Sequence, residues 1–356
     1  MSIRQLSLTD FRNLRSTTLE FHPDLNLVVG DNGSGKTSFL EAIHVLCQAQ
    51  SFRTHQLKQC IQHGKDSFLL FGRYTDFKAG LSKSGKKLTI HVDGEPVQRR
   101  SDLVRKVPIS IINASTFDLL DGAPGKRRAF LDWCLFHVKP TYADAWARAR
   151  HALKQRNQLL RSGQNLKLLD YWDEHLVEPS MEIHRMREEL CGQIDAMLRS
   201  DLSALLEAIP VELEFVRGWS GAESLESALR QQRQRDIRSG FTQSGIHRDD
   251  LLLTSRGTEA KHQLSRGESK RLCIALLLTV LKQVNDNTGK PIILLIDDLN
   301  SELDSKAQQV VYEELSRLDL QLVISNIEAS IPTPLEGKDF KWFHVEHGTI
   351  KPRNFS

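Results

Sequence analysis

A glycine-rich stretch near the N-terminus has the residue types and spacing of a phosphate-binding loop. The segment "VVGDNGSGKTSF" matches G-x-x-x-x-G-K-[ST], with Gly30, Gly35, Lys36 and Thr37 at the defining positions. The apolar run "LNLVV" precedes it, and the periodic segment "KTSFLEAIHVLCQA" follows it. A strand, a glycine turn and a helix in this order place backbone N–H groups and a positive helix N-terminus around a phosphate. A chance glycine turn is the alternative, and the strand–loop–helix context speaks against it.

This loop predicts a nucleoside triphosphate site with Mg²⁺. We expect Lys36 to reach the β- and γ-phosphates as a point charge and Thr37 to ligate the metal. A phosphate loop alone does not distinguish kinases, GTPases and motor ATPases. The predicted ATP-binding residues are those of the whole loop: Gly30, Asp31, Asn32, Gly33, Ser34, Gly35, Lys36 and Thr37.

A second candidate group lies where "IILLIDDLNSELD" ends an apolar strand with Asp297 and Asp298. A carboxylate at this place can hold the hydration shell of Mg²⁺ opposite the phosphate loop, which assigns Asp297 together with Thr37 to the metal. Asp298 is placed to orient or deprotonate the attacking water. Capping of the following turn is the alternative role for Asp298. Lys36, Asp297 and Asp298 are therefore the predicted catalytic residues.

A second turn leading into a helix occurs far downstream, in "HQLSRGESKRLCIALLL". Ser265 with Glu268 three residues later, before an apolar helix, is a capping box, and this explains the pair physically. A capping box does not need Gly267, however. It also does not explain why "LSRGE", "LLIDD" and "SELD" occur together in one chain that carries a phosphate loop.

Taken together, these motifs resemble the DNA-repair branch of the ABC-type ATPase heads, and specifically the RecF family. The order and spacing of the blocks make the resemblance specific. It covers most of the chain, in the segments "LTDFRNLRSTTLEFHPDLNLVVGDNGSGKTSFLEAI", "QSFRT", "LLDGAPGKRRAFLD", "SGIHRDDLLL", "LSRGESKR" and "LLIDDLNSELD".

The resemblance implies an ATP-dependent homodimer. In ABC-type heads the signature loop of one subunit closes over the ATP held by the other, so the second helix N-terminus would face the γ-phosphate. Asp304 would belong to the "S-x-L-D" loop. The signature residues that would act in trans are Ser265, Arg266, Gly267 and Glu268.

The chain departs from the general ABC pattern at several positions. Arg266 stands where that pattern has glycine, and Asp298 replaces the glutamate of transporter heads. Ser325 and Asn326 stand where transporters place a switch histidine, so no such histidine is assigned. Asn113, in "NAST", is a candidate for sensing Mg²⁺.

The pattern of elements predicts a single α/β fold interrupted by an inserted, mainly helical arm. The resemblance implies that this fold is an ABC-type phosphate-loop ATPase head, with a mixed sheet and flanking helices. Strand signals precede about residue 113, helical periodicity dominates from about 126 to 235, and strand–helix–strand character returns near the end. We expect a head from 1–115 and 241–356, and the arm at 116–240.

Cations suggest where DNA could bind. The arm segment around "GKRRAF" and "WARARH" is rich in Lys and Arg, and such helices contact phosphates without reading bases. An ordinary solvated helix face is the alternative. The resemblance adds Arg53, which is either a DNA contact or a solvated side chain. The predicted DNA-binding residues are Arg53, Arg127, Arg128 and Arg148.

Two further blocks of the resemblance have open roles. Arg12 and Asn13 of "DFRN" either approach the nucleotide or form a structural turn. His247 and Arg248 of "GIHRDD" either couple the nucleotide state to the arm or, for the histidine, form a buried hydrogen bond.

Composition places few constraints on function. The net charge of +3 hardly argues for an anionic partner, so the distribution of charge matters more than its sum. Five scattered cysteines without a CxxC pair indicate neither a disulfide framework nor a zinc ribbon. The first residues lack the apolar core of a signal peptide, and the longest apolar run is too short to span a bilayer. We expect a cytoplasmic protein without a membrane partner.

The sequence thus predicts an ATP-dependent DNA-binding protein of recombinational repair. The resemblance implies that its partners are single-stranded and duplex DNA, bound without sequence preference, and RecR- and RecO-like mediators that help load the recombinase. ATP hydrolysis would be slow, stimulated by DNA, and would reset the protein. An ATP-binding subunit of an ABC-type transporter is the alternative, and a metabolic kinase is a third possibility that leaves "LSRGE" and "SELD" unexplained.

Overall fold

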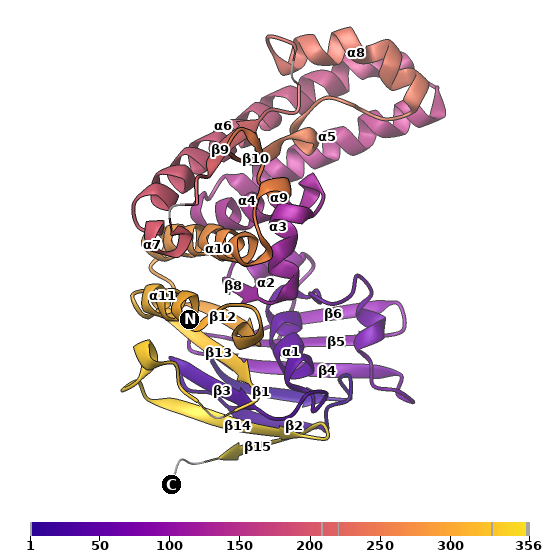
Figure 1. Ribbon diagram of the computed structural model, residues 1–356. Helices are drawn as coiled ribbons and strands as arrows, with labels where there is room; N and C mark the ends of the chain where they lie inside the picture. Colours follow the sequence, from indigo (N-terminus) through magenta and orange to yellow (C-terminus); the bar gives the residue numbers. More distant parts are fainter. Residues whose placement is uncertain (1, 208, 220, 329, 354–356) are drawn as a thin grey trace. The chain divides into compact units, whose positions relative to one another are not determined.

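The chain forms two compact units, labelled by element in Figure 1. The computed structural model describes residues 2–207, 209–219, 221–328 and 330–353. The first unit comprises Met1–Thr116 and Val284–Ser356, and the second comprises Phe117–Gln283. The first boundary between the units, after residue 116, lies one residue from the boundary expected after residue 115. The second boundary lies after residue 283, whereas it was expected after residue 240, so the signature segment belongs to the second unit. The functional boundary between head and arm stays a prediction.

The first unit contains an antiparallel sheet that is covered on one face only. Its strands follow the order β2-β1-β4-β5-β6-β7. Along β4 every second side chain is buried, as expected when one face packs on the core and the other faces solvent. The strands are β1 (Ile3–Thr9), β2 (Thr17–Glu20), β4 (Ser67–Tyr74), β5 (Lys78–Ser84), β6 (Lys87–Val92) and β7 (Glu95–Pro96).

The second sheet of this unit is mixed and follows the order β15-β14-β3-β13-β12-β8. Neighbouring strands from β14 to β8 are parallel, so their carboxyl ends meet at one edge, while β15 pairs antiparallel with β14. The three central strands are buried on both faces, in agreement with their continuous apolar runs. The strands are β3 (Leu25–Val29), β8 (Ile109–Ile112), β12 (Ile292–Asp297), β13 (Leu320–Asn326), β14 (Phe340–Glu346) and β15 (Thr349–Arg353).

Helix α1 (Lys36–Gln48) packs in the core of the first unit, against side chains from both sheets. Almost every residue of α1 is buried, including Glu41, so the helix lies inside the core of the unit and not on its surface. The Phe39 ring contacts the rings of Phe21 and Phe343 at centroid distances of 5.9 and 5.8 Å. This packing fixes the helix directly behind the phosphate loop. The unit's remaining helices include α2 (Arg100–Val104) and α11 (Ser305–Ser316).

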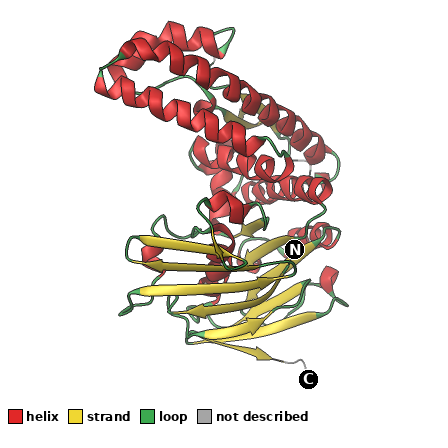
Figure 2. Cartoon of the chain, turned by 180° about the vertical axis from the view of Figure 1, so that it is seen from behind, coloured by secondary structure: helices red, strands yellow, loops and turns green. Residues whose placement is uncertain are grey.

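The second unit is mainly helical, as predicted, and Figure 2 shows its helices in red. One strand, β9 (Glu212–Val216), was not anticipated within the helical segment. It pairs antiparallel with β10 (Asp250–Ser255), a partner that is distant in sequence. No helix among the described residues is long and apolar enough to cross a membrane. The other elements are α3 (Asp118–Asp121), α4 (Pro124–Val138), α5 (Tyr142–Ser162), α6 (Leu169–Arg199), α7 (Ser203–Leu206), α8 (Leu225–Ser239), β11 (Thr258–Glu259), α9 (Ala260–Gln263) and α10 (Arg266–Thr288), whose last residues belong to the first unit.

A buried ionic cluster joins three helices of the second unit. The side chain of Arg156 on α5 is completely buried and donates to Asp173 on α6 at 2.6 Å and to Asp236 on α8 at 2.8 Å. It also donates to the Thr242 hydroxyl at 2.8 Å. A guanidinium in this setting is tolerated only because carboxylates and a hydroxyl satisfy most of its donors. Its charge therefore serves the fold and is not available to a ligand.

Candidate nucleotide-binding site

The phosphate loop joins β3 to α1 and requires glycine at two positions. A Cβ on Gly30 would lie 2.2 Å from the carbonyl oxygen of Val345 on β14, so no larger residue fits beneath that strand. Gly35 precedes α1 with φ +121°, a conformation that other residues rarely adopt. The loop geometry expected from the motif is therefore present.

Lys36 begins α1 and folds back over the loop. Its ammonium group donates to the carbonyl oxygens of Gly30 at 2.6 Å and Asp31 at 3.0 Å. No described side chain caps the N-terminus of α1, and its first turn carries no acidic residue. The backbone N–H groups of that turn are thus left for an anion, which the helix dipole also favours.

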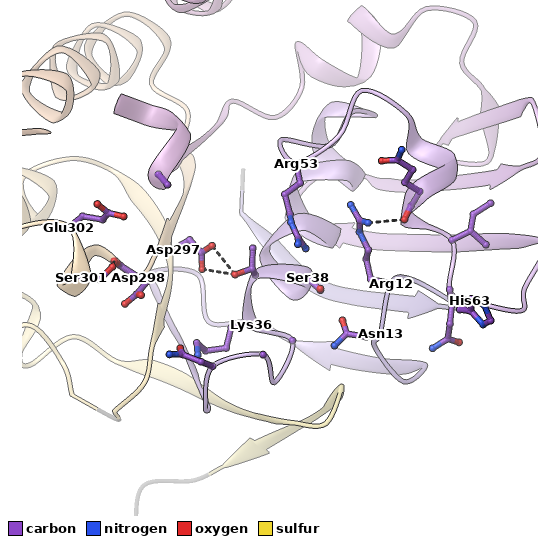
Figure 3. Close-up of a pocket in the computed structure, with 18 residues that line it drawn as sticks. Arg12, Asn13, Lys36, Ser38, Arg53, His63, Asp297, Asp298, Ser301 and Glu302 are labelled. Atoms are coloured by element: carbon purple, nitrogen blue, oxygen red, sulfur yellow. Dashed lines mark hydrogen bonds between the residues drawn. The ribbon is translucent and has the colours of Figure 1, made fainter. Parts of the chain in front are cut away.

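The two predicted metal ligands, Thr37 and Asp297, lie in contact at the edge of the mixed sheet, and Asp297 is labelled in Figure 3. The Thr37 hydroxyl lies 2.9 Å from Oδ2 of Asp297 and 3.2 Å from Oδ1. Among the described residues no three or more His, Cys, Asp or Glu side chains form a group that could hold a metal. Mg²⁺ does not need one, because it binds through one or two protein oxygens together with substrate phosphates and water. The hydroxyl and the carboxylate therefore fit Mg²⁺ delivered with a nucleotide.

Asp298 follows Asp297 in a left-handed conformation, with φ +54° and ψ +50°. This backbone turn directs the chain into the 3₁₀ turn Leu299–Ser301. The hydroxyl and the backbone N–H of Ser301 both donate to the Asp298 carbonyl, at 2.9 and 3.2 Å. Asp298 thus occupies a strained turn that its neighbours hold in place.

These groups line a single pocket of about 990 Å³ within the first unit. This volume is at the upper end of what ligand sites have. Three of the predicted ATP-binding residues do not line this pocket: Gly30, Asp31 and Ser34. The carbonyl oxygens of Gly30 and Asp31 instead accept hydrogen bonds from Lys36. The lining residues are Arg12, Asn13, Asn32, Gly33, Gly35, Lys36, Thr37, Ser38, Arg53, Gln59, Ile61, Gln62, His63, Ala114, Asp297, Asp298, Ser301 and Glu302 (Figure 3).

Two residues of the pocket wall, Arg12 and Arg53, are held from behind by Glu41, a residue that the motifs did not single out. Its carboxylate is completely buried on α1 and accepts from Arg12 at 2.7 and 2.9 Å, from Ser51 at 2.5 Å and from Arg53 at 3.4 Å. Burial alone would raise the pKa of Glu41, but the hydrogen bonds from Arg12 and Ser51 hold that pKa below its ordinary value. Glu41 is the only acidic residue of α1 and lies within its apolar run "FLEAI", and this is the signal that could have revealed it.

Arg12 and Asn13 therefore lie at the pocket wall, which favours the first of their two predicted roles. The Arg12 guanidinium also donates to the carbonyl of Gln59, so its position is determined from two sides. Arg53 lines the same pocket, and its side chain is 45% exposed. This exposure is compatible with a contact to DNA, which stays a prediction. The neighbouring residues Gln59, Gln62 and His63 had no signal in the sequence.

The signature segment forms the expected capping box in the second unit. The Glu268 carboxylate accepts from the Ser265 backbone N–H at 2.8 Å, and the Glu268 N–H donates to the Ser265 hydroxyl at 3.3 Å. Ser265, Arg266 and Gly267 are exposed. A Cβ on Gly267 would meet no described atom within 4 Å, so the fold of this chain does not require glycine there. Asp304, in the other unit, caps α11 by accepting from the Ala307 N–H at 2.9 Å.

The arginines predicted to bind DNA in the second unit are engaged with carboxylates and carbonyls. Arg127 makes two hydrogen bonds to Asp250, at 2.8 and 2.9 Å, and Arg128 donates to the Asp249 carbonyl at 2.7 Å. A DNA phosphate would have to compete with these carboxylates and this carbonyl. The contacts therefore disfavour DNA binding by the three arginines, and that role stays a prediction. Arg148 lies within 3.1 Å of three carboxylates, those of Asp144, Glu178 and Glu182.

Two other candidates have structural roles. The His247 ring nitrogen Nε2 lies 2.9 Å from the Thr242 carbonyl oxygen, and burial lowers the pKa of His247 despite that bond. This favours the buried, hydrogen-bonded histidine. The side chain of Asn113 accepts from the backbone and hydroxyl of Ser115, at 3.0 and 2.7 Å, so it organises the turn that brings Ala114 to the pocket.

Comparison with known proteins agrees with this geometry. Residues 2–349 match the family described as the RecF/RecN/SMC N terminal domain. "DNA replication and repair protein RecF" of Shewanella amazonensis is 37% identical over 360 aligned residues, which cover 98% of this chain and 99% of the relative. The protein of the same name from Aliivibrio fischeri is 34% identical over 98% of this chain and 99% of the relative.

Solved structures show the same fold. The structure described as the recombination mediator protein RecF-ATP in the RecFOR pathway aligns with a TM-score of 0.85 at 22% identity, covering 99% of this chain and 98% of that chain. An SMC head bound to the C-winged helix domain of ScpA aligns with a TM-score of 0.59 at 13% identity, covering 100% of this chain and 98% of that one. These relatives do not favour a transporter subunit. The chain belongs to the RecF family.

Proposed function

We propose that this protein binds ATP with Mg²⁺ in the pocket of the first unit and uses that ATP to control DNA binding in recombinational repair. The observation that carries the proposal is the convergence of Lys36, Thr37 and Asp297 at an uncapped helix N-terminus. Lys36 would leave its two carbonyl partners for the β- and γ-phosphates. Thr37 and Asp297 would hold Mg²⁺, which neutralises charge that develops on the phosphates.

Hydrolysis would be slow and stimulated by DNA. Asp298 lies beside the metal ligand and lines the pocket, so its carboxylate is placed to orient or deprotonate a water molecule. An aspartate reaches less far than the glutamate of transporter heads, which agrees with a protein whose ATPase resets a bound state. ATP would act mainly through binding, by shifting the population towards a dimer.

The exposed signature segment would complete the site of a second subunit. Glycine is less favourable than alanine in a helix, by about 1 kcal/mol in the helix interior. Nothing among the described residues approaches Gly267 closely enough to require glycine there. A nucleotide bound by a partner subunit would account for this residue, because a side chain would keep the helix N-terminus away from the phosphates. Ser265, Arg266 and Glu268 would take part in the same contact.

The family supplies the biological setting of the proposal. Relatives are named as DNA replication and repair proteins, and the matching structures are described as recombination mediators in the RecFOR pathway. We infer that this chain likewise binds single-stranded and duplex DNA at gaps, with RecO- and RecR-like partners. The setting for this work would be the cytoplasm.

Sedimentation of the purified protein with ADP, with ATP and with ATP plus a gapped duplex tests the proposal. We expect a monomer with ADP, a dimer with ATP and a DNA-bound dimer in the third sample. Lys36→Ala, which removes the cation expected to reach the phosphates, should stay monomeric throughout and serves as the control. A protein that is monomeric in all three samples would refute the dimer and leave Ser265 with the role of a helix cap alone.

A further inference from the structure

Ser325 has no role in the site described so far, yet it lies at the centre of it. The residue is the last but one of β13, which lies between two functional strands. In register it stands opposite Asp297 of β12 and Val28 of β3, the strand that leads to the phosphate loop. It is completely buried and is not among the residues that line the pocket. Any influence of Ser325 on a nucleotide must therefore pass through its neighbours.

The Ser325 hydroxyl holds both acidic residues. It donates to Oδ1 of Asp297 at 2.7 Å, and it accepts from the backbone N–H of Asp298 at 3.2 Å. A carboxylate can only accept and an N–H can only donate, so the single hydroxyl proton must point at Asp297 and a lone pair at Asp298. The orientation of this hydroxyl is thereby determined.

The bond between Ser325 and Asp297 lies where a nucleotide does not compete for it. Asp297 has a second partner in Thr37, but Thr37 lines the pocket and its hydroxyl is itself a predicted metal ligand. The contact with Thr37 must therefore adjust when Mg²⁺ binds. Ser325 is the partner of Asp297 that remains in place because it is buried behind the site.

The second bond supports the strained turn at Asp298. A residue with φ +54° that is not glycine persists only where its surroundings determine its position. Ser301 holds the carbonyl oxygen of Asp298, and Ser325 holds its N–H. The peptide groups on both sides of the Asp298 side chain are therefore fixed.

From this geometry we propose that Ser325 is a positioning residue for both carboxylates. It keeps Asp297 directed at the Mg²⁺ that accompanies ATP, and it keeps Asp298 directed into the pocket. The inference rests on the proposed function and deepens it. It also gives a role to the segment where transporter heads carry a histidine and this chain carries Ser325 and Asn326.

The test measures how strongly Mg²⁺ improves nucleotide binding in Ser325→Ala. Calorimetric titration with adenosine 5′-(β,γ-imido)triphosphate, in EDTA and in Mg²⁺, gives this ratio for each protein. We expect unchanged affinity in EDTA and a loss of about tenfold in the Mg²⁺-dependent gain, as for other groups that orient metal ligands. Ser180→Ala, at a fully buried serine of α6, is the matched control and should keep the full gain.

Two further variants and the unmodified protein make the result decisive. Asp297→Asn should lose the gain in nucleotide affinity that Mg²⁺ gives. Ser325→Cys is similar in size but a weak donor, so it should lose part of that gain, and it carries the test if Ser325→Ala does not fold. If Mg²⁺ improves nucleotide affinity fully in Ser325→Ala or Ser325→Cys but not in Asp297→Asn, the inference is overturned and the proposed function stays intact. No Mg²⁺-dependent binding to the unmodified protein would overturn the proposed function and the inference with it.

Discussion

The carboxylate of Glu41 and the guanidinium of Arg12 form a two-point ion pair, at 2.7 and 2.9 Å, in the wall of the nucleotide pocket. Glu41 belongs to α1 and Arg12 to the loop after β1, so the pair ties that loop to the helix that follows the phosphate loop. The paired carboxylate is completely buried, whereas the guanidinium is 20% exposed and lines the pocket. The pair therefore presents one face of Arg12 to a ligand.

Replacement of Glu41 by Gln should destabilise the first unit by about 2–4 kcal/mol, because it leaves a partly buried guanidinium without its counter-charge. Thermal or urea unfolding measures the loss. Arg53→Gln is the matched control, since Arg53 lies farther from the same carboxylate, at 3.4 Å, and is more exposed. Equal losses in the two variants would contradict the central role of the Arg12 pair.

The same pair predicts how stability depends on pH. The hydrogen bonds from Arg12 and Ser51 outweigh the effect of burial and hold the pKa of Glu41 below its ordinary value. A carboxyl with a lowered pKa contributes stability above its unfolded pKa of about 4.3, and this contribution is lost as the pH falls through the folded pKa. Unfolding between pH 6 and pH 3 should show a smaller loss for Glu41→Gln than for the unmodified protein. Identical profiles would contradict the assignment.

Lys36→Arg should lower the rate of ATP hydrolysis by about 10²-fold or more, the usual cost of removing one well-placed donor to a transition state. The planar guanidinium cannot take the place of a compact ammonium that bonds two loop carbonyls. An ATPase assay with and without gapped DNA measures the effect and checks that DNA stimulates the unmodified protein. A collapse of the thermal unfolding temperature in this variant would show that Lys36 serves the fold.

Ser265→Arg should abolish ATP-dependent dimerisation while the monomer still binds ATP. The substitution removes a capping hydroxyl, at a cost of about 1 kcal/mol, and places a bulky cation at the exposed signature. Ser224→Arg is the matched control, because the Ser224 hydroxyl caps α8 of the same unit by accepting from Ser227. Sedimentation with ATP should show a dimer for the control only. Loss of dimers in both variants would mean that capping, and not the signature, decides the result.

Arg156→Ala should unfold or loosen the second unit at a cost of about 3–5 kcal/mol, because Asp173 and Asp236 would stay buried without a counter-charge. Limited proteolysis between α5 and α8 and circular dichroism would measure the change. Nucleotide binding in the first unit should persist. A variant as stable as the unmodified protein would show that the two aspartates find other partners.

Local sequence was sufficient for the phosphate loop, the capping box of Ser265 and Glu268, and the buried strands β3, β12 and β13. Each depends on residues that are close in sequence or on a continuous apolar run. Strand β9 was not predicted because its short segment pairs with β10, which comes after the intervening helix α8. Its identity as a strand is therefore decided by a partner that local periodicity does not reveal.

Electrostatic partners were the least predictable part. The basic segment around Arg127 and Arg148 contains few acidic residues of its own. In the fold, however, Asp250 pairs with Arg127 and Glu182 pairs with Arg148, and both carboxylates come from other elements. Charge along a chain indicates a binding face only when the fold leaves that charge unpaired. Because ion pairs form across contacting elements, their partners are known only once the packing is known.

By itself, the sequence determined which residues could handle a phosphate and a metal, since the phosphate loop and the acidic strand end are defined by residue type and short spacing. The tertiary structure alone decided what positions them. The parallel register of β12 and β13 places the Ser325 hydroxyl against Asp297, and the packing of α1 places Glu41 against Arg12. Both contacts join segments far apart in the chain. Register and packing bring them together, because polar groups that are buried along with the apolar strands and with α1 must find hydrogen-bond partners inside the fold.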